Sequence, residues 1–101
     1  MSGFTSRQRS HLRSLAHSLE SVVLVGRAGV TDAVVREIDD ALEARELIKV
    51  RLSGDRDERA ASSAAIADRT RAGVAGRIGR VVILYRMHRD PSRRRVDLPP
   101  A

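Results

Sequence analysis

Two glycines, Gly26 and Gly29, stand between an apolar run that ends at Val25 and a hydroxyl residue, Thr31. Because glycine has no Cβ, it lets the chain turn sharply and lets another group approach the main chain closely. A helix capped by Thr31 would point unpaired N–H groups and a positive dipole end at the same place. This arrangement predicts the binding of a phosphate group, with Arg27 adding a positive charge at the tip of the turn.

The Gly-x-x-Gly spacing has a simpler interpretation, because two glycines between a strand and a helix most often form only a turn. Two neighbouring features favour phosphate binding: the turn leads directly into the N-cap, and the segment before it carries Arg9 and Arg13. KH-type modules clamp a nucleic-acid backbone with a Gly-x-x-Gly loop. We therefore take Gly26-Arg27-Ala28-Gly29 as the candidate nucleic-acid-binding loop.

The sequence offers little for catalysis or for metal binding. It contains no Gly-Lys-Ser/Thr of a Walker A loop, no third glycine of a dinucleotide-binding turn, and no Gly-x-Ser-x-Gly. There is no cysteine, and His11, His17 and His88 do not make up a usual zinc constellation. We expect neither enzymatic activity nor a cofactor nor a metal.

Positive charge is unevenly distributed along the 101 residues. Residues 1–30 carry a net charge of +3, residues 31–58 carry −4, and residues 59–101 carry +7. This distribution predicts a surface that faces a polyanion and an acidic back. Phe4 and Tyr85 are the only aromatic residues, which argues against nucleic-acid readers that stack bases on aromatic platforms. We therefore expect the protein to recognise the backbone and the shape of a nucleic acid.

The longest apolar run, residues 81–85, is far shorter than the ~20 residues that a membrane helix needs. The first residues also lack the apolar centre of a secretory signal. We expect a cytoplasmic protein that does not contact membranes.

The first predicted helix covers residues 6–18 and begins with a capping box formed by Thr5 and Gln8. Its apolar stripe is Leu12, Leu15, Ala16 and Leu19. Arg9, Arg13 and His17 follow at i, i+4 spacing beside that stripe, and Arg7 lies farther round. This helix is predicted to present a row of positive charge.

The rest of the chain alternates strands and helices. A strand over residues 22–25, apolar on both faces, is expected to be central in the sheet. The helix after Thr31 is expected to turn Val34, Ile38, Ala41 and Leu42 inward and Glu37, Asp39, Asp40, Glu43 and Glu46 outward. Residues 47–52 alternate with period two, and residues 57–71 form an Ala-rich helix with a thin stripe around Ala61, Ala65 and Ile66.

Two further strands, residues 74–78 and 81–85, are joined by a tight turn at Gly79-Arg80, and the second is expected in the middle of the sheet. The order α-β-α-β-α-β-β predicts one α/β domain over residues 1–101, with a mixed four-stranded sheet and helices on its faces. Its folded core is expected over about residues 5–87. Residues 88–101, with a surface His88, are expected to form a basic, partly mobile tail that could add an edge strand at Val96 and Leu98.

Four blocks of the sequence resemble the CRM domain family (chloroplast RNA splicing and ribosome maturation), in particular its single-domain bacterial members of the YhbY type. The blocks are SRQRSHLRSLAHSL, VVLVGRAGVTD, EIDDALEARELIKVRL and IGRVVILYR. The resemblance extends from about Thr5 to Pro99. It implies a fold like that of the C-terminal domain of bacterial translation initiation factor three, and binding of structured RNA in precursors of the large ribosomal subunit.

Carried over by position, the resemblance makes Gly26 to Gly29 the RNA-binding loop and Arg7, Arg9 and Arg13 the basic residues of the first helix. Thr31 at the helix start belongs to the same candidate site, and Arg80 and Arg86, which flank the last strand, are further candidates. We expect a monomer that assists ribosome assembly.

Two other functions are compatible with the sequence. Archaeal chromatin proteins of the Alba type share this general fold, so an architectural DNA-binding protein is one alternative. A protein-interaction module, in which the basic charge serves only solubility, is the other.

Overall fold

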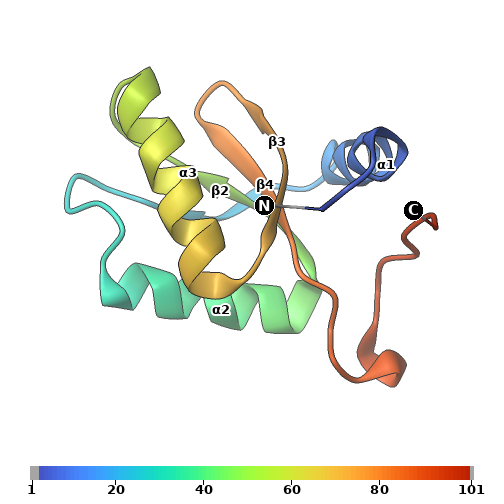
Figure 1. Ribbon diagram of the computed structural model, residues 1–101. Helices are drawn as coiled ribbons and strands as arrows, with labels where there is room; N and C mark the ends of the chain where they lie inside the picture. Colours follow the sequence, from blue (N-terminus) through green and yellow to red (C-terminus); the bar gives the residue numbers. More distant parts are fainter. Residues whose placement is uncertain (1–2, 101) are drawn as a thin grey trace.

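Four strands form one mixed sheet in the order β1-β2-β4-β3 in the computed structural model, which describes residues 3–100 (Figure 1). The strands are β1 (Ser21–Leu24), β2 (Leu47–Arg51), β3 (Gly73–Ile78) and β4 (Val81–Tyr85). β1 runs parallel to β2, whereas β2 and β4, and β4 and β3, pair antiparallel. The α/β class and the element order are as predicted, and β4 is central.

Three helices begin at the caps that the local sequence provides. In α1 (Ser6–Ala16) the backbone N–H of Gln8 donates to the Thr5 hydroxyl, and the Gln8 side chain accepts from Thr5 N–H, so the predicted capping box is confirmed. α2 (Asp32–Arg45) is capped by Thr31, which accepts from Val34 N–H at 3.2 Å. α3 (Arg56–Thr70) starts with a second capping box, formed by Asp55 and Glu58.

The helices cover the two faces of the sheet unequally. α2 and α3 cover one face, where Val23, Ile38, Ile48, Val50, Leu52, Ile66 and Leu84 belong to the larger apolar cluster. α1 covers part of the other face, where Leu12, Ala16, Leu47, Ala75, Ile83 and Tyr85 form the smaller cluster. The period-two pattern of β2 explains this division, because its alternate side chains point to opposite faces. None of the described helices is long and apolar enough to cross a membrane.

Two expectations about the sheet and its helices are wrong. β1 is an edge strand, paired only with β2, and Leu24 is 63% exposed. Its apolar composition reflects contacts of Val23 and Val25 with α2 and the core, not cover on both faces. Ala61 of α3 is exposed, because the helix instead turns Ser63, Ile66 and Thr70 inward.

Glu46 is buried, although the sequence pattern placed it on the outer face of α2. It is the C-cap of the helix, with a positive φ of +64°, and its side chain is buried. The Glu46 carboxylate accepts hydrogen bonds from the N–H groups of His88 (2.6 Å), Arg95 (2.5 Å) and Val96 (2.9 Å). Burial raises the pKa of Glu46, but these three hydrogen bonds outweigh it and hold the pKa below its usual value.

The segment after β4 is tied to the rest of the molecule by these bonds. His88, expected at the surface, is 7% exposed, and its Nε2 lies 3.0 Å from a Glu43 carboxylate oxygen. Residues 91–93 form a 3-10 helix, and the edge strand allowed by Val96 and Leu98 does not form. Instead, Val96 and Leu98 pack against the smaller cluster, and the side-chain amide of Gln8 donates to Pro99 C=O at 2.8 Å.

Candidate nucleic-acid interface

Three connections between elements meet at one end of the sheet. Because β1 and β2 are parallel and β4 is antiparallel to β2, the segments 25–31, 52–55 and 79–80 all lie at this end. The Ser53 hydroxyl donates to Gly26 C=O at 3.0 Å, and Leu52 N–H donates to Arg80 C=O at 2.6 Å. We call this surface the three-loop end; it lies at the upper left of Figure 1.

The Gly-x-x-Gly loop is a tight turn closed by one backbone hydrogen bond. Gly29 N–H donates to Gly26 C=O at 3.0 Å, which places Arg27 and Ala28 at the tip. Gly29 has φ +77°, a conformation that favours glycine. A Cβ added at either glycine would meet no atom within 4 Å, so there is open space on that side of both residues.

The start of α2 adds donors beside this turn. The N–H groups of Val34 and Val35 both donate to Thr31, to its hydroxyl and its carbonyl respectively. The N–H groups of Asp32 and Ala33 have no acceptor among residues 3–100, as is usual for a helix N-terminus. They remain available to an anion.

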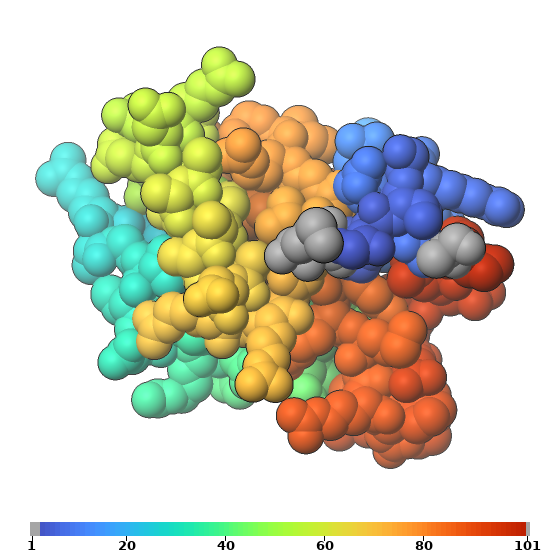
Figure 2. Space-filling model, in the orientation of Figure 1, coloured from blue at the N-terminus to red at the C-terminus, as the bar shows by residue number. Residues whose placement is uncertain are grey.

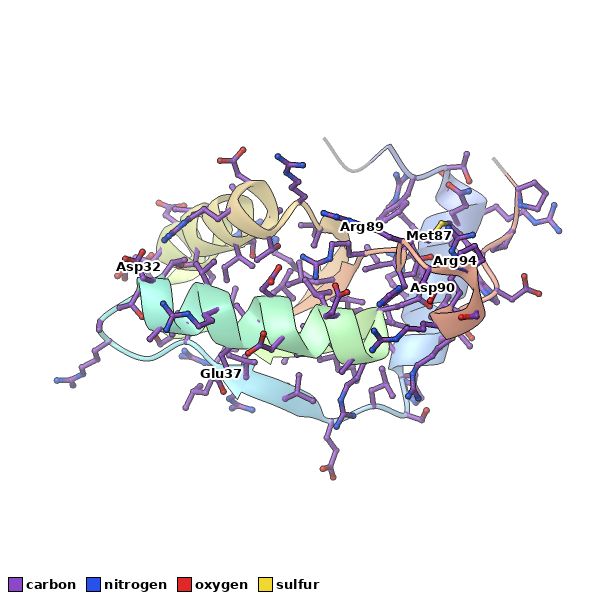
Figure 3. All side chains as sticks on the ribbon, turned by 90° about the horizontal axis from the view of Figure 1, so that it is seen from below. Asp32, Glu37, Met87, Arg89, Asp90 and Arg94 are labelled. Carbon is purple, nitrogen blue, oxygen red and sulfur yellow. The ribbon has the colours of Figure 1, made fainter. Side chains whose placement is uncertain are left out.

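Asp32 carries a carboxylate near this anion site, and that carboxylate is paired. Asp32, at the loop end of α2 in Figure 3, forms an ion pair with Arg69 of α3 at 2.7 Å. The hydrogen bond from Arg69, together with its positive charge, lowers the pKa of Asp32 below its usual value. The charge of Arg69 therefore offsets part of the repulsion that Asp32 would exert on an anion at the helix start.

The predicted site residues do not all come together. Arg27 and Arg80 lie at the three-loop end with Gly26, Ala28, Gly29 and Thr31. The basic residues Arg7, Arg9 and Arg13 belong to α1. This helix packs on the face of the sheet that α2 and α3 leave uncovered, and Figure 1 shows it separated from the loop. Arg9 donates to Phe4 C=O at 2.8 Å and to the Ser6 hydroxyl at 3.2 Å. The aliphatic part of Arg13 lies over Gly76 of β3.

Arg86 is held by the acidic helix at the other end of the molecule. Its guanidinium contacts carboxylate oxygens of Asp39 at 2.5 Å and Glu43 at 3.2 Å. It also donates to Thr70 C=O at 2.8 Å. This geometry assigns Arg86 to the internal contacts of α2 and α3 and keeps it away from the loop.

Three arginines at the three-loop end were missed in the sequence. Arg56 and Arg59 of α3 line a hollow together with Arg77 and Gly79 of the β3–β4 hairpin. The available signal was the turn pattern, because Ser53-Gly54-Asp55 precedes two of these arginines and Gly79 follows the third. The described residues include no group of three His, Cys, Asp or Glu side chains that could hold a metal ion.

Comparison with known proteins identifies the family to which the sequence is similar. The family model of the CRS1/YhbY (CRM) domain matches residues 4–86. An "RNA-binding protein" of Haemophilus influenzae is 39% identical over 87 residues, covering 85% of this chain and 88% of its own length. "Probable RNA-binding protein YqeI" of Bacillus subtilis is 34% identical over 96 residues, covering 94% and 98%.

A solved structure shares the fold. The solution structure of a hypothetical Staphylococcus aureus protein, with a proposed RNA-binding role, superimposes with a TM-score of 0.82 at 31% identity. The match covers 95% of this chain and 99% of that one.

Proposed function

Because this chain belongs to the CRS1/YhbY (CRM) domain family, we propose that it binds structured RNA and that residues 26–29 form its main phosphate contact. The observation that carries the proposal is the open space beside Gly26 and Gly29, next to the free N–H groups of Asp32 and Ala33. Backbone donors at a helix start suit a phosphate oxygen, and Arg27 adds a charged donor.

Recognition would rest on backbone and shape. The rings of Phe4 and Tyr85 pack against each other with centroids 5.9 Å apart, and Tyr85 is 4% exposed. Tyr85 is therefore not free to stack on a base, and one part of the half-buried Phe4 ring is occupied by Tyr85. Phosphate contacts fix the position of a protein on a nucleic acid but do not read its sequence.

The finer part of the proposal is that the RNA is ribosomal RNA in precursors of the large subunit, bound by a cytoplasmic monomer that assists assembly. Its support is the resemblance to the YhbY type of bacterial CRM protein. The acidic outer face of α2, directed away from the loop, would help to orient the protein by repelling RNA.

Gly26→Val tests the loop. Gly26 is better suited than Gly29, because Gly29 has φ +77°, where any L side chain is strained. We expect affinity for a fluorescein-labelled stem-loop RNA to fall at least about tenfold, the loss of about 1.4 kcal/mol of backbone contacts. Ala64→Val, on the exposed side of α3, is the control for added bulk and should bind normally.

Thermal melting of both variants establishes that they fold. Unchanged affinity in folded Gly26→Val would remove the loop from the mechanism, and preference for duplex DNA in direct competition would favour the chromatin-type alternative.

Sedimentation of a lysate on a sucrose gradient tests the proposed role in ribosome assembly. Comigration with incomplete large subunits, lost after brief nuclease treatment, is the expected result, whereas protein at the top of the gradient contradicts an assembly role.

A further inference from the structure

The beginning of α3 and the β3–β4 turn form a hollow whose charged lining is entirely arginine. Arg56, Arg59 and Arg77 line it, together with Gly79. The next residue along the turn, Arg80, lies beside it. In Figure 2 the first turn of α3 (yellow-green) and the hairpin (orange) are in contact, and the 25–31 segment (cyan) lies on the same side of the molecule.

Two of these guanidinium groups converge on one carbonyl. Arg59 donates to Gly54 C=O at 2.8 Å, and an Nη of Arg80 lies 3.5 Å from the same oxygen. This arrangement holds like charges close together, with a neutral acceptor between them. Such a juxtaposition is relieved when an anion binds.

No carboxylate within residues 3–100 forms an ion pair with any of the four arginines. The ion pairs of the described chain instead involve Arg69 and Arg86. Three acids lie at the start of α3: Asp55 and Glu58 bind backbone N–H groups in the capping box, and Asp57 is exposed in the first turn. Their three negative charges are fewer than the four positive charges of the arginines, so a net positive charge remains beside the hollow.

We propose that this hollow binds a second phosphate group of the RNA backbone. The inference rests on the proposed function and extends it: the RNA backbone would run from residues 26–29, past Ser53 and Gly54, to the arginines. The Ser53 hydroxyl is bonded to Gly26 C=O, and the Gly54 carbonyl is bonded to Arg59, so the two phosphate sites are joined through adjacent residues. Arginine suits this role, because its planar guanidinium binds phosphate oxygens in pairs.

The test replaces Arg56 and Arg77, whose side chains form no hydrogen bond or ion pair with residues 3–100. The double variant Arg56→Gln/Arg77→Gln leaves the Arg59 and Arg80 contacts with Gly54 in place. Arg45→Gln/Arg93→Gln, two exposed arginines outside the three-loop end, is the control with the same loss of charge. The affinity of each variant for the stem-loop RNA is measured over a series of salt concentrations, together with wild type and Gly26→Val.

We expect the slope of log affinity against log salt to decrease by about 0.7 to 0.9 in Arg56→Gln/Arg77→Gln, which is the contribution of the one phosphate contact that the hollow would make. The control should keep the wild-type slope. If the two double variants behave alike while Gly26→Val is weakened, the second site is refuted and the proposed function stands. If the affinity of wild type for RNA does not depend on salt, or if Gly26→Val binds as wild type does, the proposed function itself is refuted.

A second measurement does not depend on RNA. In NMR titrations with tripolyphosphate, the side-chain Nε–H signals of Arg56 and Arg77 should shift, whereas those of Arg69 and Arg86, already paired with carboxylates, should stay in place. Equal shifts at all four arginines would mean diffuse charge attraction and would overturn the site.

Discussion

The two ends of the molecule use positive charge in opposite ways. At the end formed by residues 86–96, which we call the tail end, positive side chains and backbone N–H groups meet the carboxylates of Asp39, Glu43 and Glu46. Figure 3 shows Arg89, Asp90 and Arg94 gathered there, at the opposite end of α2 from Asp32. At the three-loop end Arg69 meets the carboxylate of Asp32, whereas Arg59 and Arg80 meet the carbonyl of Gly54. The paired charges at the tail end therefore serve the fold, and most of the arginines at the three-loop end are available to a ligand.

Glu46 carries the largest expected effect on stability. Glu46→Ala leaves three N–H groups without their acceptor, and we expect a loss of about 3 kcal/mol in the free energy of unfolding, because buried donors without a partner are costly. RNA affinity of the folded fraction should change little. Urea denaturation at neutral pH measures the loss, and a loss as small as that of a typical surface substitution would contradict the role given to this carboxylate.

The stabilisation by Glu46 should depend on pH. Because its folded pKa lies below the ordinary value of 4.5, the stabilisation is complete above pH 4.5 and is lost as the pH falls through the folded pKa. The difference in stability between wild type and Glu46→Gln should therefore shrink on acidification, since both then hold a neutral group. A difference that stays constant down to the acid limit of the folded state would show that the charge of Glu46 is not involved.

The smallest expected effects come from single arginines, one at each end. Arg86→Gln should lower stability by about 1 kcal/mol, through loss of partly exposed ion pairs and the bond to Thr70, and leave RNA affinity unchanged. Arg27→Gln should leave stability unchanged and reduce the salt slope of RNA binding by about 0.7 to 0.9. Unfolding curves and binding isotherms of the two variants measure these effects. A loss of stability in Arg27→Gln together with a loss of RNA affinity in Arg86→Gln would contradict the comparison of the two ends.

Short-range signals in the sequence predicted the elements well. The Thr5–Gln8 capping box and the Thr31 cap depend on atoms three residues apart, so the local sequence suffices to predict them. The central position of β4 follows from its unbroken apolar run. β1 shows the limit of that argument, because four residues apolar on both faces do not reveal whether a second strand pairs with the outer edge.

Long-range contacts account for the other errors. Glu46 continues the acidic pattern of α2, and only its positive φ and the return of the chain at His88 make it an internal acceptor. The same holds for the candidate site. Arg86 flanks a strand as predicted, but α2 supplies its partners; Arg56 and Arg77 come together only because the α3 start and the hairpin share one end of the sheet.

The hydrogen bond between Gln8 and Pro99 also affects the expected rate of unfolding. It joins positions 91 residues apart, and the bonds from Glu46 to Arg95 and Val96 span 49 and 50 residues. Closing such long loops costs chain entropy, so we expect these contacts to form after the main folding barrier has been crossed. Their loss would then accelerate unfolding without slowing folding, and a protease would gain its first access to the chain through residues 88–100.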